Sequence, residues 1–187
     1  MNLSKIITKF YPTDIFVAIS EDNNKSDLAF LCHKILSAKY KTLFLEKPIN
    51  LIKLNPTVKR VLYKTANYLD HIKPMILIST GKLELTEILD KGYVILNWND
   101  LNDQKIPDNL KNKVVFYGTD KDNCNVWIDN IKLEGYKNSF ELNFGVERVK
   151  INYNHLGRYQ IFPALAAATL GILQGLSLIQ IKKVLEN

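Results

Sequence analysis

Short, continuous runs of apolar residues recur along the first two thirds of the chain, and each is followed by a polar stretch. These runs predict strands at 14–20, 41–46, 74–79, 93–97 and 113–118. Continuous apolar runs of this length are typical of strands that are buried on both faces of a parallel sheet.

Between these runs, apolar residues are spaced as on one face of a helix. The spacing predicts helices over 26–38, 57–72 and 83–91. Alternation of strand and helix is typical of an α/β layered fold with right-handed crossovers. We therefore expect a mainly parallel, P-loop-type sheet flanked by helices, with the 14–20 strand at its centre.

The pattern changes to a period of two after Cys124. The segments 124–135, 136–145 and 146–154 alternate apolar and polar residues and are separated by glycines. Such alternation predicts an antiparallel meander of three strands with one face in water.

The tail returns to a helical pattern and predicts two helices, over 158–175 and 177–186. Gly175 is a suitable C-terminal stop for the first helix, and Ser177 is a suitable N-cap for the second. Six apolar residues of the first helix are expected to pack against the sheet: Leu165, Ala166, Ala168, Leu170, Ile172 and Leu173. The chain contains no linker-like segment, so we expect one domain over residues 1–187.

Composition narrows the possible functions. The chain is 47% hydrophobic and 24% charged, as is ordinary for a soluble globular protein. It has no apolar run long enough to cross a bilayer and no secretory leader, so we expect a cytoplasmic protein. The net charge is +6, but the lysines are scattered among acidic residues, which argues against a nucleic-acid partner.

Cysteine and histidine do not form a metal-binding pattern. Cys32 and Cys124 lie far apart, and the three histidines show no H-x-x-x-H spacing, so a zinc site is not expected. Cys32 falls on the expected buried face of a helix, where packing is its predicted role.

The segment "SEDNNKS" (20–26) joins the first predicted strand to the first predicted helix. Lys25 and Ser26 stand at the helix start, as in the phosphate-binding loop G-x-x-x-x-G-K-S/T, but every glycine of that loop is absent.

Three later segments together resemble the central domain of Mur ligases. They are "GYVILNWNDLN" (92–102), "VVFYGTDKDNCNVWIDNIKLEGYKNSFELNFG" (114–145) and "HLGRYQIFPALAAATLGILQGLSLIQIKKVLE" (155–186). The resemblance is strongest to the ligases that add D-alanyl-D-alanine to the peptidoglycan precursor. It implies an ATP- and Mg²⁺-dependent reaction in which a carboxylate is activated as an acyl phosphate and attacked by an amine. It also implies an N-terminal UDP-sugar domain and a C-terminal amino-acid domain, neither of which fits within 187 residues.

The resemblance places the phosphates of ATP at residues 20–26. Lys25 matches the lysine that reaches the phosphates, and Ser26 matches the hydroxyl that binds Mg²⁺. The loop glycines fall on Glu21 and Asn24; Asn24 tolerates a left-handed backbone, but Glu21 adds a side chain and a negative charge. At about 5 Å and an effective dielectric of about 20, each like-charge pair costs about 3 kcal/mol. Asp22 and Asp27 add to this repulsion.

The resemblance also places adenine near the segment that contains Arg158. In the family this segment reads G-R-H-N-x-x-N, and its second asparagine holds adenine. Pro163 occupies that position here and has no side-chain amide, although proline suits the first turn of a helix.

The family's other polar positions are matched in part. Glu46 could supply the carboxylate that binds Mg²⁺ or could be a solvated strand end. The histidine expected after the next strand is absent, and "ISTGKLELTEIL" offers Lys82 and Glu84 instead. Asn97 and Asp100 match the family's L-N-x-D-D segment; the alternative interpretation is a polar turn that caps the following loop.

Two hypotheses follow. The first is a degenerate Mur-ligase-like domain without effective ATP binding or ligase activity, which acts as a binding or scaffolding module linked to peptidoglycan synthesis. The second is a reduced ATP-dependent ligase or ATPase subunit, completed by a partner chain that supplies the missing domains. In the second hypothesis, Lys25, Ser26 and Glu46 remain functional.

Overall fold

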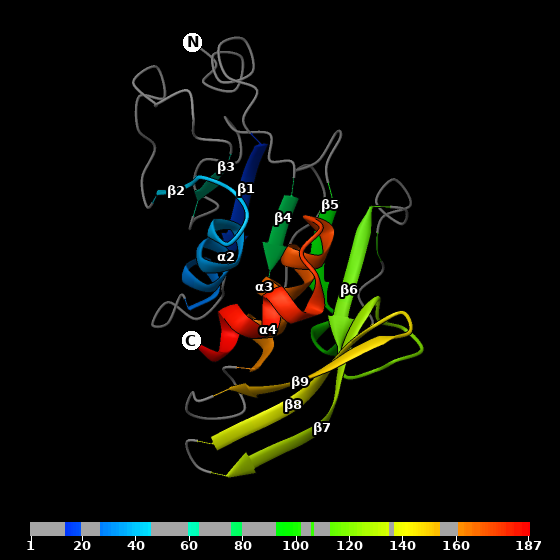
Figure 1. The fold of residues 1–187 in the computed structure, drawn as a ribbon. Coiled ribbons are helices and arrows are strands. Elements are labelled where there is room, and N and C mark those ends of the chain that lie inside the picture. The colour runs from blue at the N-terminus through cyan, green and yellow to red at the C-terminus, as the bar shows by residue number, and fades with distance from the viewer. Residues whose placement is uncertain are drawn as a thin grey trace, which may run out of the picture.

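The computed structural model describes residues 14–19, 27–45, 60–63, 76–79, 93–101, 106, 113–134, 137–153 and 161–187. Its strands form one nine-stranded sheet in the order β2-β3-β1-β4-β5-β6-β7-β8-β9 (Figure 1). The fold is mixed α/β, with a parallel part followed by an antiparallel part, as the sequence predicts.

Six strands form the parallel part, and β7 joins it in parallel to β6. The six are β1 (Asp14–Ile19), β2 (Thr42–Leu45), β3 (Arg60–Tyr63), β4 (Ile76–Ser79), β5 (Tyr93–Asn97) and β6 (Val114–Gly118). Strand β1 lies between β3 and β4, so its predicted central place is confirmed.

The helix predicted over 57–72 is wrong where the structure describes it, because Arg60–Tyr63 forms β3. This strand bonds to β2 on one side and to β1 on the other. Pairing on both sides outweighs the helical spacing of its apolar residues. The helix predicted over 83–91 lies outside the described residues.

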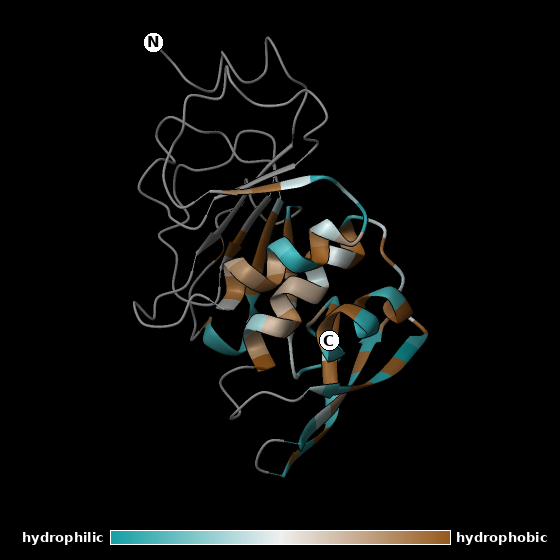
Figure 2. Ribbon diagram, turned by 60° about the vertical axis from the view of Figure 1, so that its left-hand side comes forward, coloured by the Kyte–Doolittle hydropathy of each residue, from teal (hydrophilic) through white to brown (hydrophobic). Residues whose placement is uncertain are grey.

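The predicted meander is confirmed as β7 (Val126–Glu134), β8 (Lys137–Phe144) and β9 (Glu147–Tyr153), which pair antiparallel to one another. Figure 2 shows teal and brown alternating along these strands. A bulge between Asp129 and Lys132 contains Asn130, which has a positive φ of 50° and donates from Nδ2 to Glu141 Oε2 at 3.0 Å.

Three helices, α2 (Asp27–Ser37), α3 (Ile161–Leu173) and α4 (Leu178–Glu186), pack against the sheet and one another. The 3-10 turn η2 (Trp98–Asp100) follows β5. The predicted caps are confirmed: Ser177 accepts from the Gln180 N–H in a capping box, and Gly175 has a φ of +73°. Among the described helices, none is long and apolar enough to span a membrane.

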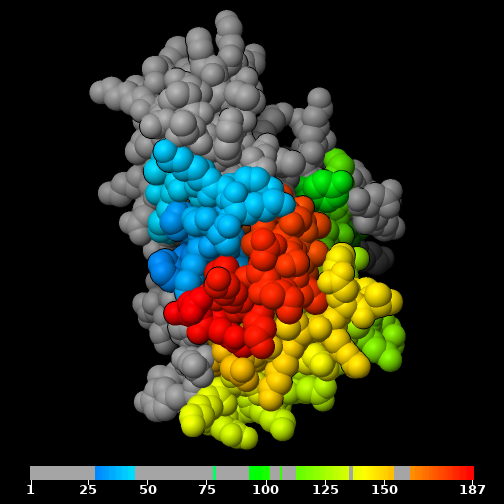
Figure 3. Space-filling model, in the orientation of Figure 1, coloured from blue at the N-terminus to red at the C-terminus, as the bar shows by residue number. Residues whose placement is uncertain are grey.

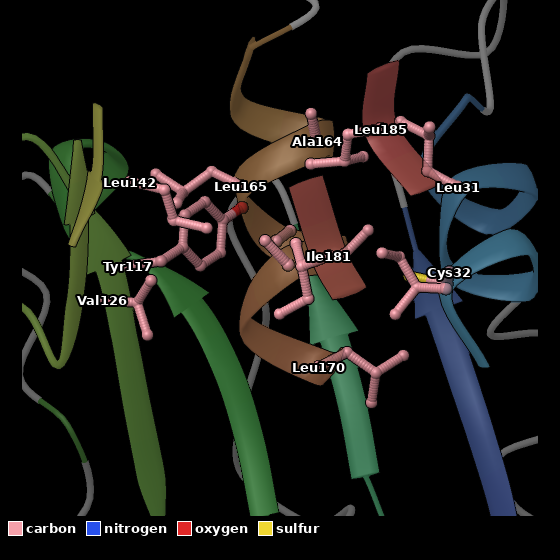
Figure 4. Close-up of a cluster of buried hydrophobic side chains, with 14 of the residues drawn as sticks. Leu31, Cys32, Tyr117, Val126, Leu142, Ala164, Leu165, Leu170, Ile181 and Leu185 are labelled. Carbon is pink, nitrogen blue, oxygen red and sulfur yellow. The ribbon is translucent and has the colours of Figure 1, made fainter. Parts of the chain in front are cut away.

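Helix α3 provides the centre of the core. Its side chains Ala164, Leu165 and Leu170 are fully buried in the cluster that the helix forms with the sheet and with helices α2 and α4 (Figure 4). Cys32 of α2 is fully buried in the same cluster, as predicted. The prediction for Leu173 is wrong, because this side chain is 39% exposed at the end of α3.

Candidate functional site

The carboxyl ends of the parallel strands meet at one edge of the sheet. At this edge the neighbouring strands β1 and β4 end at Ile19 and Ser79, and the chain then continues to β2 on one side and to β5 on the other. Such a switch point is the usual ligand position in an open α/β sheet. Strands β5 and β6 end beside it, at Asn97 and Gly118.

In the turn after β5, polar side chains form hydrogen bonds within the turn itself. Asn97 is buried, and its Nδ2 donates to Asp100 Oδ2 at 2.5 Å. Its Oδ1 accepts from the Asn99 N–H at 3.1 Å, which makes Asn97 the N-cap of η2. Both ends of the Asn97 amide are therefore used within the turn.

A second set of bonds joins this turn to the loop after β6. Asn99 donates from Nδ2 to Thr119 Oγ1 at 2.9 Å and accepts at Oδ1 from the Thr119 N–H at 3.1 Å. A Cβ atom on Gly118 would lie 2.5 Å from Asn99 Oδ1 and 3.0 Å from Cys124 Sγ. Glycine at this position permits the close approach of the two loops.

The loop after β6 also contains hydrogen bonds between its own residues. Asp120 Oδ1 accepts from the Asp122 N–H at 2.9 Å, and its Oδ2 accepts from Asn123 Nδ2 at 2.8 Å. The Asn123 side chain, followed by the Asp122 backbone, holds the pKa of Asp120 below its usual value. Burial raises the pKa of Tyr117 well above its usual value, and the charge of Asp100 raises it further.

Helix α3 begins at this edge. In Figure 4 the helix runs from Ala164 to Leu170 against the direction of the strand arrows, so its first turn lies at the carboxyl ends of the strands. Pro163 stands in that turn and is partly buried. It presents no hydrogen-bond donor to the edge, because proline lacks both an N–H and a polar side chain.

The chain matches the Mur ligase middle domain over residues 8–171. It belongs to the Mur ligase family. No curated protein matches its sequence significantly.

Solved Mur ligase structures share this fold at low sequence identity. MurF from Acinetobacter baumannii has a TM-score of 0.76 and 18% identity, and the match covers 96% of this chain and 47% of that chain. A pseudomurein peptide ligase type C from Methanothermus fervidus has a TM-score of 0.70 and 14% identity, covering 97% of this chain and 51% of that chain. The murein peptide ligase mpl from Psychrobacter arcticus has a TM-score of 0.69 and 10% identity, covering all of this chain (100%) and 49% of that chain. The chain thus spans about half the length of these proteins.

The structure describes two of the site residues that the resemblance to Mur ligases implies. The structure brings Asn97 and Asp100 together at the switch-point edge. The other predicted site residues lie outside the described residues: Asn24, Lys25, Ser26, Glu46 and Arg158. Helix α2 begins at Asp27, directly after Ser26. Among the described residues, no group of three His, Cys, Asp or Glu side chains is placed to hold a metal ion.

Mur ligases are ATP- and Mg²⁺-dependent enzymes. At Pro163, the described position where the resemblance implies the adenine contact, the side chain has no amide. Asn97, which matches the family's L-N-x-D-D segment, has its amide bonded to Asp100 and Asn99.

Sequence reasoning missed the bonds that Asn99, Thr119 and Asp120 make between and within the two loops. The signal was a run of Asn, Asp, Thr and Gly directly after two adjacent strands. Because parallel strands end at one edge, such runs are expected to meet.

Proposed function

We propose that this chain is a degenerate Mur-ligase middle domain that keeps the family's scaffold without effective ATP binding or ligase activity. It acts as a binding or scaffolding module linked to peptidoglycan synthesis. Its cytoplasmic location stays a prediction.

The observation that carries the proposal is Pro163 in the first turn of α3. The helix keeps its place on the sheet, with Ala164 and Leu165 fully buried, so the scaffold tolerates the proline. The adenine contact that the resemblance implies is lost with the amide. At the other end of the nucleotide, Glu21 replaces a glycine and adds a negative charge. The loss of a contact to adenine and of a loop glycine at the phosphates supports a site that no longer binds ATP effectively.

The proposal is tested by titrating the chain with Mg-ATP in a calorimeter. We expect a dissociation constant no tighter than about 1 mM, which corresponds to about 4 kcal/mol. Restoring both loop glycines, with Glu21→Gly and Asn24→Gly, is expected to tighten phosphate binding more than it changes stability. Lys25→Ala is expected to leave binding by the unmodified chain unchanged.

Lys34→Ala provides the matched control, because Lys34 lies in the last turn of α2, away from the helix start. Micromolar Mg-ATP binding that Lys25→Ala abolishes and Lys34→Ala preserves would replace this proposal with the enzyme hypothesis.

A second candidate function is a reduced ligase or ATPase subunit completed by a partner chain. It is favoured by Lys25 and Ser26, which this chain retains at the positions where the resemblance places the phosphate-binding lysine and the Mg²⁺-binding hydroxyl. ATP-dependent release of phosphate by a co-purified complex, lost on Lys25→Ala in this chain, would support this function.

A further inference from the structure

The helices α2, α3 and α4 form one outer layer of the molecule. Figure 3 shows them together on one face, with α2 in blue to cyan, α3 in orange and α4 in red. Helix α2 contacts both α3 and α4. The segment after α2 also reaches the segment before α4, because Lys39 donates from Nζ to the carbonyl oxygens of Gln174 and Gly175, both at 2.9 Å. The outward sides of α2 and α4 therefore belong to one surface.

Both helices expose the same kind of side-chain pair, a large apolar residue followed by a lysine one helical turn later. On α2 the pair is Phe30, which is 58% exposed, and the partly exposed Lys34. On α4 it is Ile179, which is 67% exposed, and the exposed Lys183. Residues four apart lie on one side of a helix. Each helix thus presents an apolar side chain beside an ammonium group, and we call these four side chains the docking face.

The docking face is not used to hold the fold together. The ammonium groups of Lys34 and Lys183 make no hydrogen bond or ion pair to the part of the chain that the structure describes. Phe30 and Ile179 lie outside the buried hydrophobic cluster to which their helices contribute. An exposed apolar side chain is common on its own, but its repeated pairing with a lysine on two contacting helices is a pattern that a partner can use.

The fold also sorts charges that are scattered along the sequence. Residues 27–41 and 161–187, which include the three helices, carry five lysines and two acidic residues, whereas residues 119–153 carry five basic and six acidic residues. Of the two acidic residues of the helical layer, Glu186 already accepts from the Asn152 N–H at 2.8 Å and lies 3.4 Å from Lys182 Nζ. The helical layer is therefore basic, and the meander with its preceding loop is not. The five lysines are Lys34, Lys39, Lys41, Lys182 and Lys183.

Lysines beside exposed apolar side chains match the chemistry of an anionic lipid surface. Apolar side chains of a surface helix enter the boundary between headgroups and acyl chains, and lysines extend their ammonium groups to the lipid phosphates. An anionic leaflet attracts lysines near its surface, and this attraction does not require an exact spacing. A nucleic acid would also attract the lysines, but its phosphate backbone offers no apolar layer that could receive Ile179.

We propose that the docking face binds the surface of an anionic lipid bilayer, with Phe30 and Ile179 at the headgroup boundary and Lys34 and Lys183 beside the lipid phosphates. The contact is peripheral and reversible, because two apolar side chains bury far less surface than a lipid anchor does. It involves the outward sides of two helices and no nucleotide, so it does not depend on whether the chain binds ATP.

The test is cosedimentation of the whole chain with vesicles, without nucleotide. One set of vesicles is phosphatidylcholine alone, and the other contains about one third phosphatidylglycerol, which supplies the negative surface charge. We expect binding to the anionic vesicles only, and weaker binding as the salt concentration rises, because salt screens the lysines. Equal binding to both kinds of vesicle, or binding to neither, would overturn the proposal.

Two double variants separate the charged part of the docking face from its apolar part. Lys34→Gln/Lys183→Gln is expected to weaken binding to the anionic vesicles about 30-fold, since each lysine near such a surface contributes about fivefold. Phe30→Ser/Ile179→Ser is expected to weaken binding at least about tenfold while the salt dependence remains, because the variant removes apolar surface and no charge. Unchanged binding by either folded variant would contradict the proposal. If Phe30→Ser/Ile179→Ser is unfolded in circular dichroism, Phe30→Gln/Ile179→Gln removes the same apolar groups with a better helix former.

Matched controls come from the meander, which lies outside the helical layer. Lys132→Gln/Lys137→Gln removes two exposed lysines, and Val146→Ser removes a fully exposed apolar side chain (101%). Both controls are expected to bind as the unmodified chain does, and a loss as large as that of the helix variants would show that the docking face is not the site. Duplex DNA replaces the vesicles in a last arm. Binding to DNA that Phe30→Ser/Ile179→Ser leaves unchanged, without binding to vesicles, would replace the lipid surface with a nucleic acid and overturn the proposal.

Discussion

The close approach of the two loops at Gly118 gives a quantitative prediction. In Gly118→Ala, the new Cβ would lie 2.5 Å from Asn99 Oδ1, so the Asn99 side chain has to move. That movement breaks both Asn99–Thr119 hydrogen bonds, of 2.9 and 3.1 Å. Because φ of Gly118 lies outside the left-handed region, alanine fits the backbone itself.

The expected magnitude follows from these bonds. Two hydrogen bonds at an exposed position contribute about 2 kcal/mol. Replacing glycine with alanine also lowers the conformational entropy of the unfolded chain, which raises the free energy of unfolding by about 0.5 kcal/mol. We expect Gly118→Ala to lower the free energy of unfolding by about 1.5 kcal/mol, and Asn99→Ala to lower it by about 2 kcal/mol.

The double variant distinguishes this mechanism from two independent losses. Asn99→Ala removes the oxygen that the new Cβ meets, so adding Gly118→Ala is expected to cause little further loss. The coupling between the two changes should be about 1–2 kcal/mol. Asn99→Asp is the control, because it keeps an oxygen near Gly118 and is therefore expected to leave the clash in place.

Urea unfolding followed by circular dichroism and by tryptophan fluorescence measures these changes, with Trp98 as a reporter in the same turn. For a chain of this size, each kcal/mol corresponds to about 2–4 °C in the melting temperature. Strictly additive effects of Gly118→Ala and Asn99→Ala would refute the mechanism.

Three further predictions concern stability. Leu165→Asp is expected to unfold the domain, because it places an unpaired charge at a fully buried site. Leu173→Asp, at a 39% exposed site, should change the free energy of unfolding by less than about 1 kcal/mol. Equal melting temperatures for the two variants would contradict this. Burial raises the pKa of Cys124 to about 11, so the unfolded chain releases the thiol proton at lower pH than the folded chain. The urea midpoint is therefore expected to fall as pH rises from about 8.5 towards 11, and Cys124→Ser should reduce that fall; a midpoint that rises would exclude this linkage. Lys39 and Tyr40 donate to the carbonyls that follow α3, at 2.9–3.0 Å. The double variant Lys39→Met/Tyr40→Phe is therefore expected to lower the free energy of unfolding by about 1–2 kcal/mol. An unchanged urea midpoint would show that these hydrogen bonds are not stabilising.

The ends of the last two helices were predictable because their signals are local. Ser177 caps α4 and Gly175 ends the preceding segment through bonds within a few residues. The meander was predictable for a similar reason, since alternation with a period of two reflects one buried and one wet face. Asn97 and Asp100 could be assigned to the candidate site from the resemblance, because the L-N-x-D-D match is a local motif at the end of an apolar strand.

The amino-acid sequence by itself thus determined the α/β class, the caps, the meander and the family resemblance, all of which depend on local spacing and residue type. Only the tertiary structure decided that Arg60–Tyr63 is a strand, because hydrogen bonds to β1 and β2 override its helical spacing. It alone showed that Leu173 faces water, because α3 is apolar all round and its spacing marks no single buried face. The Asn99–Thr119 and Lys182–Lys150 hydrogen bonds likewise needed the structure, since they join residues 20 and 32 positions apart that the fold brings together.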